Sequence, residues 1–314
     1  MKKTSILFAA LLLAAVSCTK EGNDSGPKKM DITLTASIAD LQTKTVYTDP
    51  ADGTLKMDWE ATGETISVVT YDATNGIIRN EVLTGTKSGT DCLFSGTVTE
   101  LESGQKYLCI YPALSGPTTI GGKTCYTSEK GALQYVVEDK KFTFTHDKVK
   151  QEKNGSTDHL KYADLLTGEP TFSGGNAVVS LEHQIGVLKV VLSLTPEYMG
   201  RYLNGFKITD SYTPSFTPDL KVTDFSSFAF IPGESLFSLT EVLDGENFIV
   251  GLDLMATFYI PMAPCTIPAD GYYRITVTEG ITDKSINKNP PVAVNIEKGK
   301  MTTLKISGGS DVWI

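Results

Sequence analysis

Histidine, tryptophan and cysteine are scarce in this sequence, with three, two and five copies among 314 residues. The three histidines, His146, His159 and His183, stand at no metal-binding spacing from one another or from a cysteine, so no zinc site is predicted. A GxSxG nucleophile elbow is also missing, and Ser, His and Asp cannot be grouped where nearly every strand carries Ser or Thr. We therefore expect a protein that is not an enzyme and that uses no cofactor.

Positive charge is scarce as well. Lys and Arg number 28 against 37 Asp and Glu, which gives a net charge of -9 and a pI near 5.0. Such a chain cannot neutralise phosphates, so nucleic acid is excluded as a partner. Hydrophobic residues make up 40% of the chain, which is enough for cores of ordinary size. Beyond the first eighteen residues, no apolar run approaches the length of a membrane span.

The N-terminus has the pattern of an export signal. Lys2 and Lys3 precede an apolar run over residues 6–16, which is too short for a permanent transmembrane helix, and small residues then lead into Cys18. This pattern is typical of a bacterial lipoprotein signal, in which the cysteine is lipidated and becomes the mature N-terminus; an ordinary secretory signal is the weaker alternative. We expect a signal peptide over 1–18, a polar tether over 19–29 and anchoring to the outer membrane through Cys18.

Four further cysteines follow in the exported part of the chain: Cys92, Cys109, Cys125 and Cys265. Their compartment permits disulfides, and one or two bridges are conceivable, for example between Cys109 and either Cys125 or Cys92. The alternative is that all four are buried, unpaired thiols that pack as small hydrophobic residues. So few cysteines in so long a chain favour the unpaired state.

A two-residue periodicity dominates the rest of the sequence. In residues 31–38 the apolar side chains of Ile32, Leu34, Ala36 and Ile38 alternate with Thr and Ser, which predicts a half-buried strand. Comparable runs, separated by turn-forming pairs, cover 66–71, 107–111, 141–145, 177–181, 186–194, 248–254, 274–278, 292–296 and 302–306. Helical periodicity is nearly absent. The sequence therefore predicts an all-β fold built from β-sandwiches.

Glycine and proline interrupt this pattern about halfway, over residues 168–176. We expect an N-terminal β-sandwich over 30–172 and a C-terminal β-sandwich over 173–314, each of ordinary domain size. The Gly122-Lys123-Thr124 tripeptide resembles the end of a phosphate-binding loop, but the first glycine is replaced by Pro117 and no helix follows, so a turn is predicted. Tyr111 and the Tyr272-Tyr273 pair could stack on a sugar, although core or edge packing is favoured.

Several segments, taken in order, resemble the fimbrillin family, the type V pilins of Bacteroidales. The resemblance covers nearly all of the mature chain and is carried by TKTVY at 43–47, MDWEATGETISV at 57–68, YADLL at 162–166, LEHQIGVLKV at 181–190, FYIPMAP at 258–264 and KGKMTTL at 298–304. It departs from the family pattern at Glu64, where aspartate is commoner, and by one extra residue between Trp59 and Gly63.

The resemblance implies two tandem transthyretin-like, Greek-key sandwiches and a structural role in a fimbrium at the cell surface that supports adhesion. Such pilins are exported as lipoprotein precursors. A processing protease then removes the first strand, and a strand of another subunit takes its place by donor-strand exchange. On this sequence the displaced strand would carry Ile32, Leu34, Ala36 and Ile38. The expected cut follows Lys44, because no arginine precedes residue 79.

The family resemblance leaves the C-terminal end open to two interpretations. Either residues 292–306 form the hairpin that is donated to the next subunit, or the subunit accepts a strand without donating one and sits at a tip or an anchor. A different class of function, a glycan-binding surface lipoprotein of a polysaccharide-uptake system, would share the tether and the sandwiches. For His183 we expect a packed, hydrogen-bonded position at the start of the second core.

Overall fold

The computed structural model describes residues 26–38, 59–144, 150–210, 217, 219–224, 229–233, 236, 238–243, 247–269, 273–288 and 293–307. Within these residues the chain forms β-strands joined by turns and three short 3-10 helices: η1 (Glu129–Gly131), η3 (Asp158–Tyr162) and η4 (Pro196–Tyr198). The all-β expectation is therefore confirmed. No helix in this described part of the chain has the length and hydropathy needed to cross a membrane.

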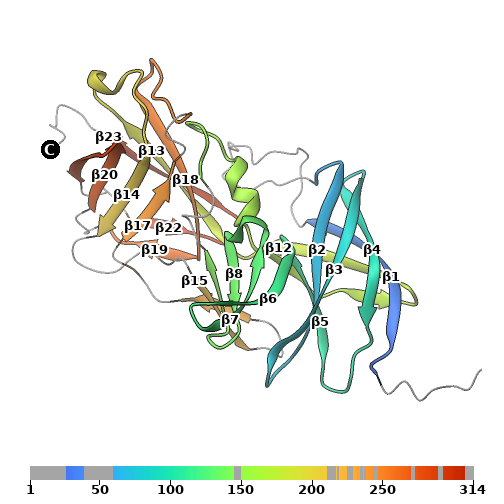
Figure 1. Ribbon diagram of the computed structural model, residues 1–314. Helices are drawn as coiled ribbons and strands as arrows, with labels where there is room; N and C mark the ends of the chain where they lie inside the picture. The colour runs from blue at the N-terminus through green and yellow to red at the C-terminus, as the bar shows by residue number, and fades with distance from the viewer. Residues whose placement is uncertain are drawn as a thin grey trace, which may run out of the picture.

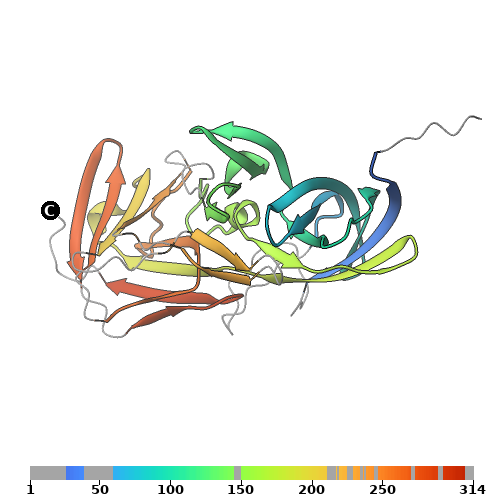
Figure 2. The same cartoon turned by 90° about the horizontal axis from the view of Figure 1, so that it is seen from below.

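The N-terminal half is built around a sheet that closes on itself. Its strands are β1 (Lys29–Ile38), β2 (Thr62–Asp72), β3 (Gly76–Ser88), β4 (Asp91–Thr99), β5 (Lys106–Tyr111), β10 (Leu166–Gly168), β11 (Thr171–Ser173) and β12 (Asn176–His183). They follow the order β1-β4-β3-β2-β5-β10-β12-β11, and an additional pairing of β1 with β12 closes seven of them into a ring, while β11 pairs with β12 alone. Figure 2 shows these strands curling into a ring. β1, the earliest strand among the described residues, thus completes the closure.

The C-terminal half is made of two sheets that pack face to face. One holds β18 (Met255–Met262), β13 (Gly186–Ser193) and β23 (Met301–Ser307) in that order. The other holds β17 (Ser238–Val242), β14 (Gly205–Asp210), β20 (Tyr273–Glu279) and β21 (Thr282–Lys288), again in that order. Both sheets contribute to one buried cluster, in which the Phe206 and Phe258 rings stack with centroids 4.3 Å apart. A small pair, β19 (Cys265–Ile267) and β22 (Val294–Ile296), lies beside them.

A six-stranded sheet takes strands from both sides of the expected domain boundary. It runs β16-β15-β9-β8-β7-β6, from the strands β6 (Leu114–Ile120), β7 (Lys123–Ser128), β8 (Leu133–Val136), β9 (Lys141–Phe144), β15 (Asp219–Asp224) and β16 (Ala229–Pro232). Its core includes Phe142 and Leu220 together with Val69 and Ile110, which point outward from the closed sheet. Figure 1 shows this sheet between the other two bodies.

The passage from one half to the other is short. β12 belongs to the closed sheet and β13 to the C-terminal sheet, and only Gln184 and Ile185 separate them. The position 172/173, at which the sequence analysis divides the chain, falls inside β11. Because β11 and β12 pair as a hairpin (Ser173 opposite Asn176), the N-terminal sheet continues past this point to His183.

Candidate functional site

β1 is hydrogen-bonded along both of its edges. It runs antiparallel to β4, from Lys29 opposite Thr99 to Ala36 opposite Cys92. It runs parallel to β12, from Thr33 opposite Asn176 to Ile38 opposite Leu181. A strand between two partners in this way is a central strand, although it is the first strand of the described residues. Removing it would leave two unpaired edges that face each other across a groove.

The inward face of β1 fills the core of the closed sheet. The structure brings together all four predicted side chains, with exposed fractions of 3% for Ile32, 0% for Leu34, 0% for Ala36 and 4% for Ile38. They belong to one cluster, to which each of the seven strands of the ring contributes. Burial of a Leu or Ile side chain is worth about 1.5–3 kcal/mol. The groove would therefore present a row of apolar sites at every second position, which is the spacing that another β-strand could fill.

Polar contacts of β1 with its neighbours are local. On its outward face the Thr97 hydroxyl donates to the Asp31 carboxylate at 2.6 Å, and the Ser37 hydroxyl donates to the Val179 carbonyl at 3.4 Å. The Thr33 amide also donates to the Gly175 carbonyl at 3.0 Å. None of these contacts depends on a buried charge, so backbone pairing and apolar burial hold the strand.

The chain returns from β1 to the same core at Trp59. This side chain is fully buried, and its ring meets the Phe94 and Tyr111 rings edge to face at 5.6 and 5.2 Å. Next to it the Tyr111 hydroxyl donates to the Glu64 carboxylate at 2.9 Å. Burial raises the pKa of Glu64, although the Glu60 amide and the Tyr111 hydroxyl act in the opposite direction. The two ends of the segment 39–58 are thus set in one core, on β1 and at Trp59.

Cys18 and Lys44, the predicted lipidation and cleavage positions, lie outside the described residues. The four remaining cysteines are all free thiols, and Cys92, Cys109 and Cys125 are buried while Cys265 is half-buried. The unpaired alternative is therefore confirmed for them. Burial raises the pKa of the Cys92 thiol to about 12, which makes this sulfur a poor nucleophile in the folded protein.

Histidine and tyrosine candidates occupy core positions. His183 ends β12 at 6% exposure, and its Nδ1 lies 2.6 Å from a carboxylate oxygen of Asp164, as expected for a packed, hydrogen-bonded histidine. Tyr111 and Tyr273 are buried at 8% and 1%, so they form no platform for a sugar, and Tyr272 lies outside the described residues. Within the described ranges, no three His, Cys, Asp or Glu side chains gather closely enough to hold a metal ion.

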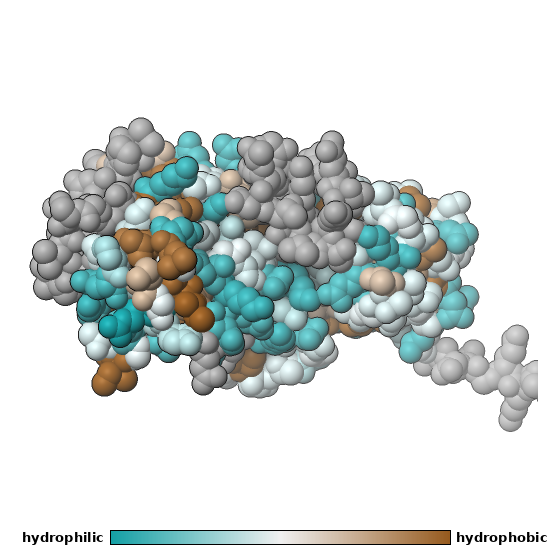
Figure 3. All heavy atoms as spheres, turned by 90° about the horizontal axis from the view of Figure 1, so that it is seen from above, coloured by the Kyte–Doolittle hydropathy of each residue, from teal (hydrophilic) through white to brown (hydrophobic). Residues whose placement is uncertain are grey.

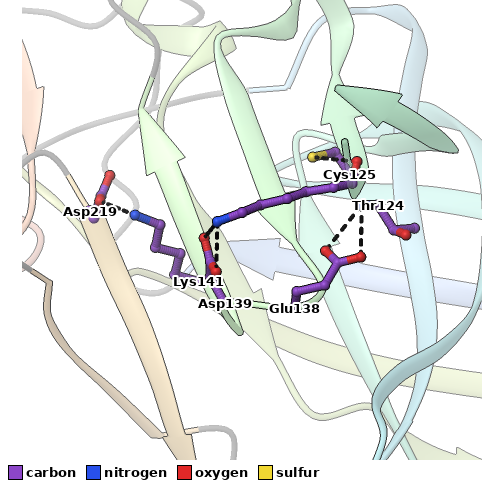
Figure 4. Close-up of polar contacts among 7 residues, drawn as sticks. Thr124, Cys125, Glu138, Asp139, Lys141 and Asp219 are labelled. Atoms are coloured by element: carbon purple, nitrogen blue, oxygen red, sulfur yellow. Dashed lines mark hydrogen bonds and ion pairs between the residues drawn. The ribbon is translucent and has the colours of Figure 1, made fainter. Parts of the chain in front are cut away.

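The Lys123-Thr124 segment is part of a surface clamp rather than a phosphate loop. It follows the turn between β6 and β7, and the Lys123 ammonium pairs with the Asp139 carboxylate at 2.6 Å, which lowers the pKa of Asp139 (Figure 4). The Thr124 amide donates to the Glu138 carboxylate at 3.0 Å. The turn predicted at this position is confirmed. The carboxylates of Asp139 and Glu138 both bind the residues that follow it.

Another ion pair links the two halves of the chain. The Lys141 ammonium on β9 lies 2.8 Å from the Asp219 carboxylate on β15 (Figure 4). Asp219 is largely buried, with a side-chain exposure of 11%. Partly buried pairs are less screened by salt than exposed ones. This contact therefore stabilises the pairing of β9 with β15 in the six-stranded sheet.

The outer edge of β18 is covered by amide side chains that the sequence analysis does not single out. Gln151 donates from Nε2 to the Thr257 carbonyl at 2.8 Å and accepts from the Tyr259 amide at 3.1 Å. Asn154 repeats the arrangement one step along, with donation to the Met255 carbonyl at 2.6 Å and acceptance from the Thr257 amide at 2.8 Å. These contacts imitate a neighbouring strand, so they protect an edge that could otherwise pair with another chain.

Comparison with known proteins yields structural matches only. No family model and no curated protein matches the chain. A candidate cell adhesion protein of Bacteroides ovatus is 13% identical over 92% of this chain and 95% of its own, with a TM-score of 0.44. A fimbrial assembly protein of Parabacteroides distasonis is 13% identical over 92% and 94%, with a TM-score of 0.38. The fimbrial anchor protein Mfa2 of Porphyromonas gingivalis is 11% identical over 82% of each chain, with a TM-score of 0.36.

These solved structures are described as fimbrial or candidate cell adhesion proteins of Bacteroidales, consistent with the fimbrillin-like family that the sequence resembles. At 11–13% identity the alignments transfer no residue role to this chain. Its function has to be inferred from its own strands.

Proposed function

We propose that this chain is a structural subunit of a surface fimbria that is assembled by exchange of its first strand. In this proposal the precursor is exported and held at the outer membrane through lipidated Cys18. A protease cuts after Lys44, β1 leaves, and a strand of another subunit enters between β4 and β12. The role requires no catalysis and no cofactor.

The position of β1 is the observation that carries the proposal. In the part of the chain that the structure describes, this strand comes first, it closes the sheet on both edges, and it fills the core with four side chains in alternation. An alternating strand can be replaced by another one with the same pattern, because the backbone hydrogen bonds provide affinity and the alternate side chains fix the register. Loss of β1 exposes apolar surface that favours association until the groove is filled.

The burial of Trp59 supports a cut within residues 39–58. Since Trp59 is anchored in the core beside Phe94 and Tyr111, a cut after Lys44 frees β1 while the new N-terminal end stays attached to the closed sheet. We propose that the two transthyretin-like sandwich domains meet at residues 184–185, where β12 passes into β13, rather than at 172/173.

The packing of β23 indicates whether residues 292–306 can be donated to another subunit. Leu304 and Ile306 of β23 are buried at 6% and 8% in the C-terminal core, and β23 pairs in parallel with β13. Donation of this hairpin to another subunit would open that core. The proposal therefore takes the acceptor alternative: a subunit that receives a strand without donating residues 292–306, at a tip or an anchor of the fimbria.

N-terminal sequencing of protein sheared from the cell surface tests the proposal. We expect the mature chain to begin at Thr45. A Lys44→Gln variant should retain β1 and remain unassembled, whereas Lys56→Gln, a matched change in the same segment, should be processed as usual. If the surface protein carries only Cys18 at its N-terminus and still assembles, the cleavage and the exchange of β1 are both wrong, and a permanently anchored glycan-binding lipoprotein becomes the better interpretation.

A further inference from the structure

Four side chains of β1 face the core, and they differ in size. Ile32, Leu34 and Ile38 are large, whereas Ala36, the third along the strand, contributes a single methyl group. Ala36 nevertheless has an exposed fraction of 0%. Because protein interiors are packed with few voids, an alanine that is fully covered leaves little room for a larger side chain.

The neighbours of Ile32 and Leu34 on the adjacent strands leave room for large side chains. Ile32 lies opposite Gly96 on β4, and Leu34 lies between Phe94 on β4 and Ala177 on β12. Each therefore has a glycine or an alanine on at least one side. Large and small side chains that alternate across a row in this way interdigitate well.

The Ala36 site has no such neighbour. Ala36 lies between Cys92 on β4 and Val179 on β12, and both belong to the same buried cluster. With larger side chains on both sides, one methyl group fills the middle of this row. Ile38 lies past the last β4 pair, with Leu181 opposite it on β12. In the direction of β1, the groove thus accepts side chains that are large, large, small and large.

The outward face of β1 discriminates less between strands. Its residues Thr33, Thr35 and Ser37 carry small hydroxyl side chains that are exposed or half-buried. Figure 3 shows mainly pale and teal residues on the visible face of the closed sheet, at the right. Since changes at exposed positions have small effects, the inward face decides which strand fits.

Alternation alone leaves the register of an incoming strand open. A slip by one residue turns the apolar side chains outward, but a slip by two residues keeps them inward. For the sequence of β1, a slip by two in either direction would place Leu34 or Ile38 at the Ala36 site. Reversal of the strand in the same groove would place Leu34 there. Overfilling a packed site weakens binding about fivefold to 150-fold, so the Ala36 site disfavours all three arrangements.

We propose that the Ala36 site fixes the register and the direction of the strand that replaces β1. The partner is then an extended segment of another subunit whose four inward side chains are large, large, small and large. This inference rests on the proposed exchange of β1. No four alternate residues within 292–306 follow this order in either direction. The C-terminal hairpin of a second copy therefore does not fit, and the strand belongs to a subunit with a different sequence.

Competition between two peptides of the same composition tests the inference. The full chain is cut at a specific protease site inserted after Lys44 and brought to equilibrium with an excess of two peptides that cover residues 28–40. One has the native sequence, and the other carries Leu34→Ala with Ala36→Leu, so that the two side chains trade places. Because their masses are equal, the native peptide is isotope-labelled; bound peptide is isolated by size-exclusion chromatography and quantified by mass spectrometry. We expect the native order to be favoured at least about a hundredfold, since the variant leaves a cavity at one site and overfills the other.

Matched controls separate the Ala36 site from the rest of the groove. A peptide with Thr35→Ser and Ser37→Thr trades side chains on the outward face and should bind within about threefold of the native peptide. In the protein, Val179→Ala removes a buried neighbour of the Ala36 site and should improve binding of the Ala36→Leu peptide at least about fivefold. Val178→Ala, at the next residue, changes an exposed side chain and should not.

The possible failures are distinguishable. Equal binding of the native and traded peptides would overturn the inference and leave the exchange of β1 standing. If the native peptide does not enter the groove, the exchange is wrong and the inference falls with it. An Ala36→Leu peptide that gains nothing from Val179→Ala would also overturn the inference. If Val179→Ala does not fold, Cys92→Ala on the other side of the site provides the same measurement.

Discussion

Replacing Leu34 with alanine is the sharpest test of how β1 is held. Leu34 lies at the middle of the strand with no exposed surface, and its side chain is surrounded by the core of the closed sheet. Truncation of a fully buried leucine costs about 2–5 kcal/mol, because the lost transfer free energy is increased by the cavity that remains. In the intact protein this loss lowers the free energy of unfolding.

In protein that has been cut after Lys44, the same loss acts on the noncovalent retention of β1. Since 1.4 kcal/mol corresponds to a factor of ten, we expect the fragment that carries Leu34→Ala to be held about 25-fold to several thousand-fold more weakly. The cut can be made at a specific protease site inserted after Lys44. Release of the fragment is then followed over time by size-exclusion chromatography and mass spectrometry.

Thr35→Ala provides the matched control. Thr35 is the next residue of the same strand, is only half-buried and points to the outward face, so its truncation should change retention within about threefold. Equal release of the Leu34→Ala and Thr35→Ala fragments would refute the reasoning, because the apolar inward face would then contribute nothing specific to holding the strand.

Other predictions concern charge, edge protection and thiol access. Burial raises the pKa of Glu64 above 4.5, so the folded state holds this proton more tightly than the unfolded state does. The free energy of unfolding should therefore fall as the pH rises above 4.5 through the folded-state pKa. Urea titrations at several pH values should show this fall, and Glu64→Gln should make it shallower. Gln151→Ala should cost about 1–3 kcal/mol by leaving edge groups of β18 unpaired and should increase light scattering, whereas the exposed Glu152→Ala should not. Cys92, opposite β1, should resist alkylation in the intact protein and react after β1 is released, while Cys125, outside that core, stays protected throughout.

The sequence is most informative where one residue type repeats at a fixed interval. The alternation of Ile32, Leu34, Ala36 and Ile38 with polar residues correctly predicts a strand with one buried face, because a period of two reports directly on a pleated surface with a single core. It cannot report the strand's partners. β12 lies more than 130 residues away in the sequence, and nothing in either segment indicates that they pair in parallel and close the sheet.

The roles of isolated polar residues also cannot be predicted from the sequence. Gln151 and Asn154 stand in a polar segment that looks like an ordinary loop, and only the path of β18 gives their amides a role. The domain boundary shows a related difficulty: Gly174 and Gly175 interrupt the apolar pattern as a linker would, but they form the turn of the β11–β12 hairpin, where Gly174 has a φ of 63°. Turn signals predict where a strand ends, and they do not predict which core the next strand joins.

The direct passage of β12 into β13 has a mechanical consequence. A load that pulls the two halves apart would act on this extended passage, since only two residues lie between the strands, together with the pairing of β9 with β15. Within the C-terminal half, β13 is flanked by β18 on one side and β23 on the other, over the register pairs from 186 to 193 and from 187 to 193. Tension along β13 therefore shears two ladders lengthwise, so that many hydrogen bonds resist together, whereas a force across the strands would unzip them one by one. The strand that joins the closed-sheet core to the C-terminal core therefore resists load best along its own length.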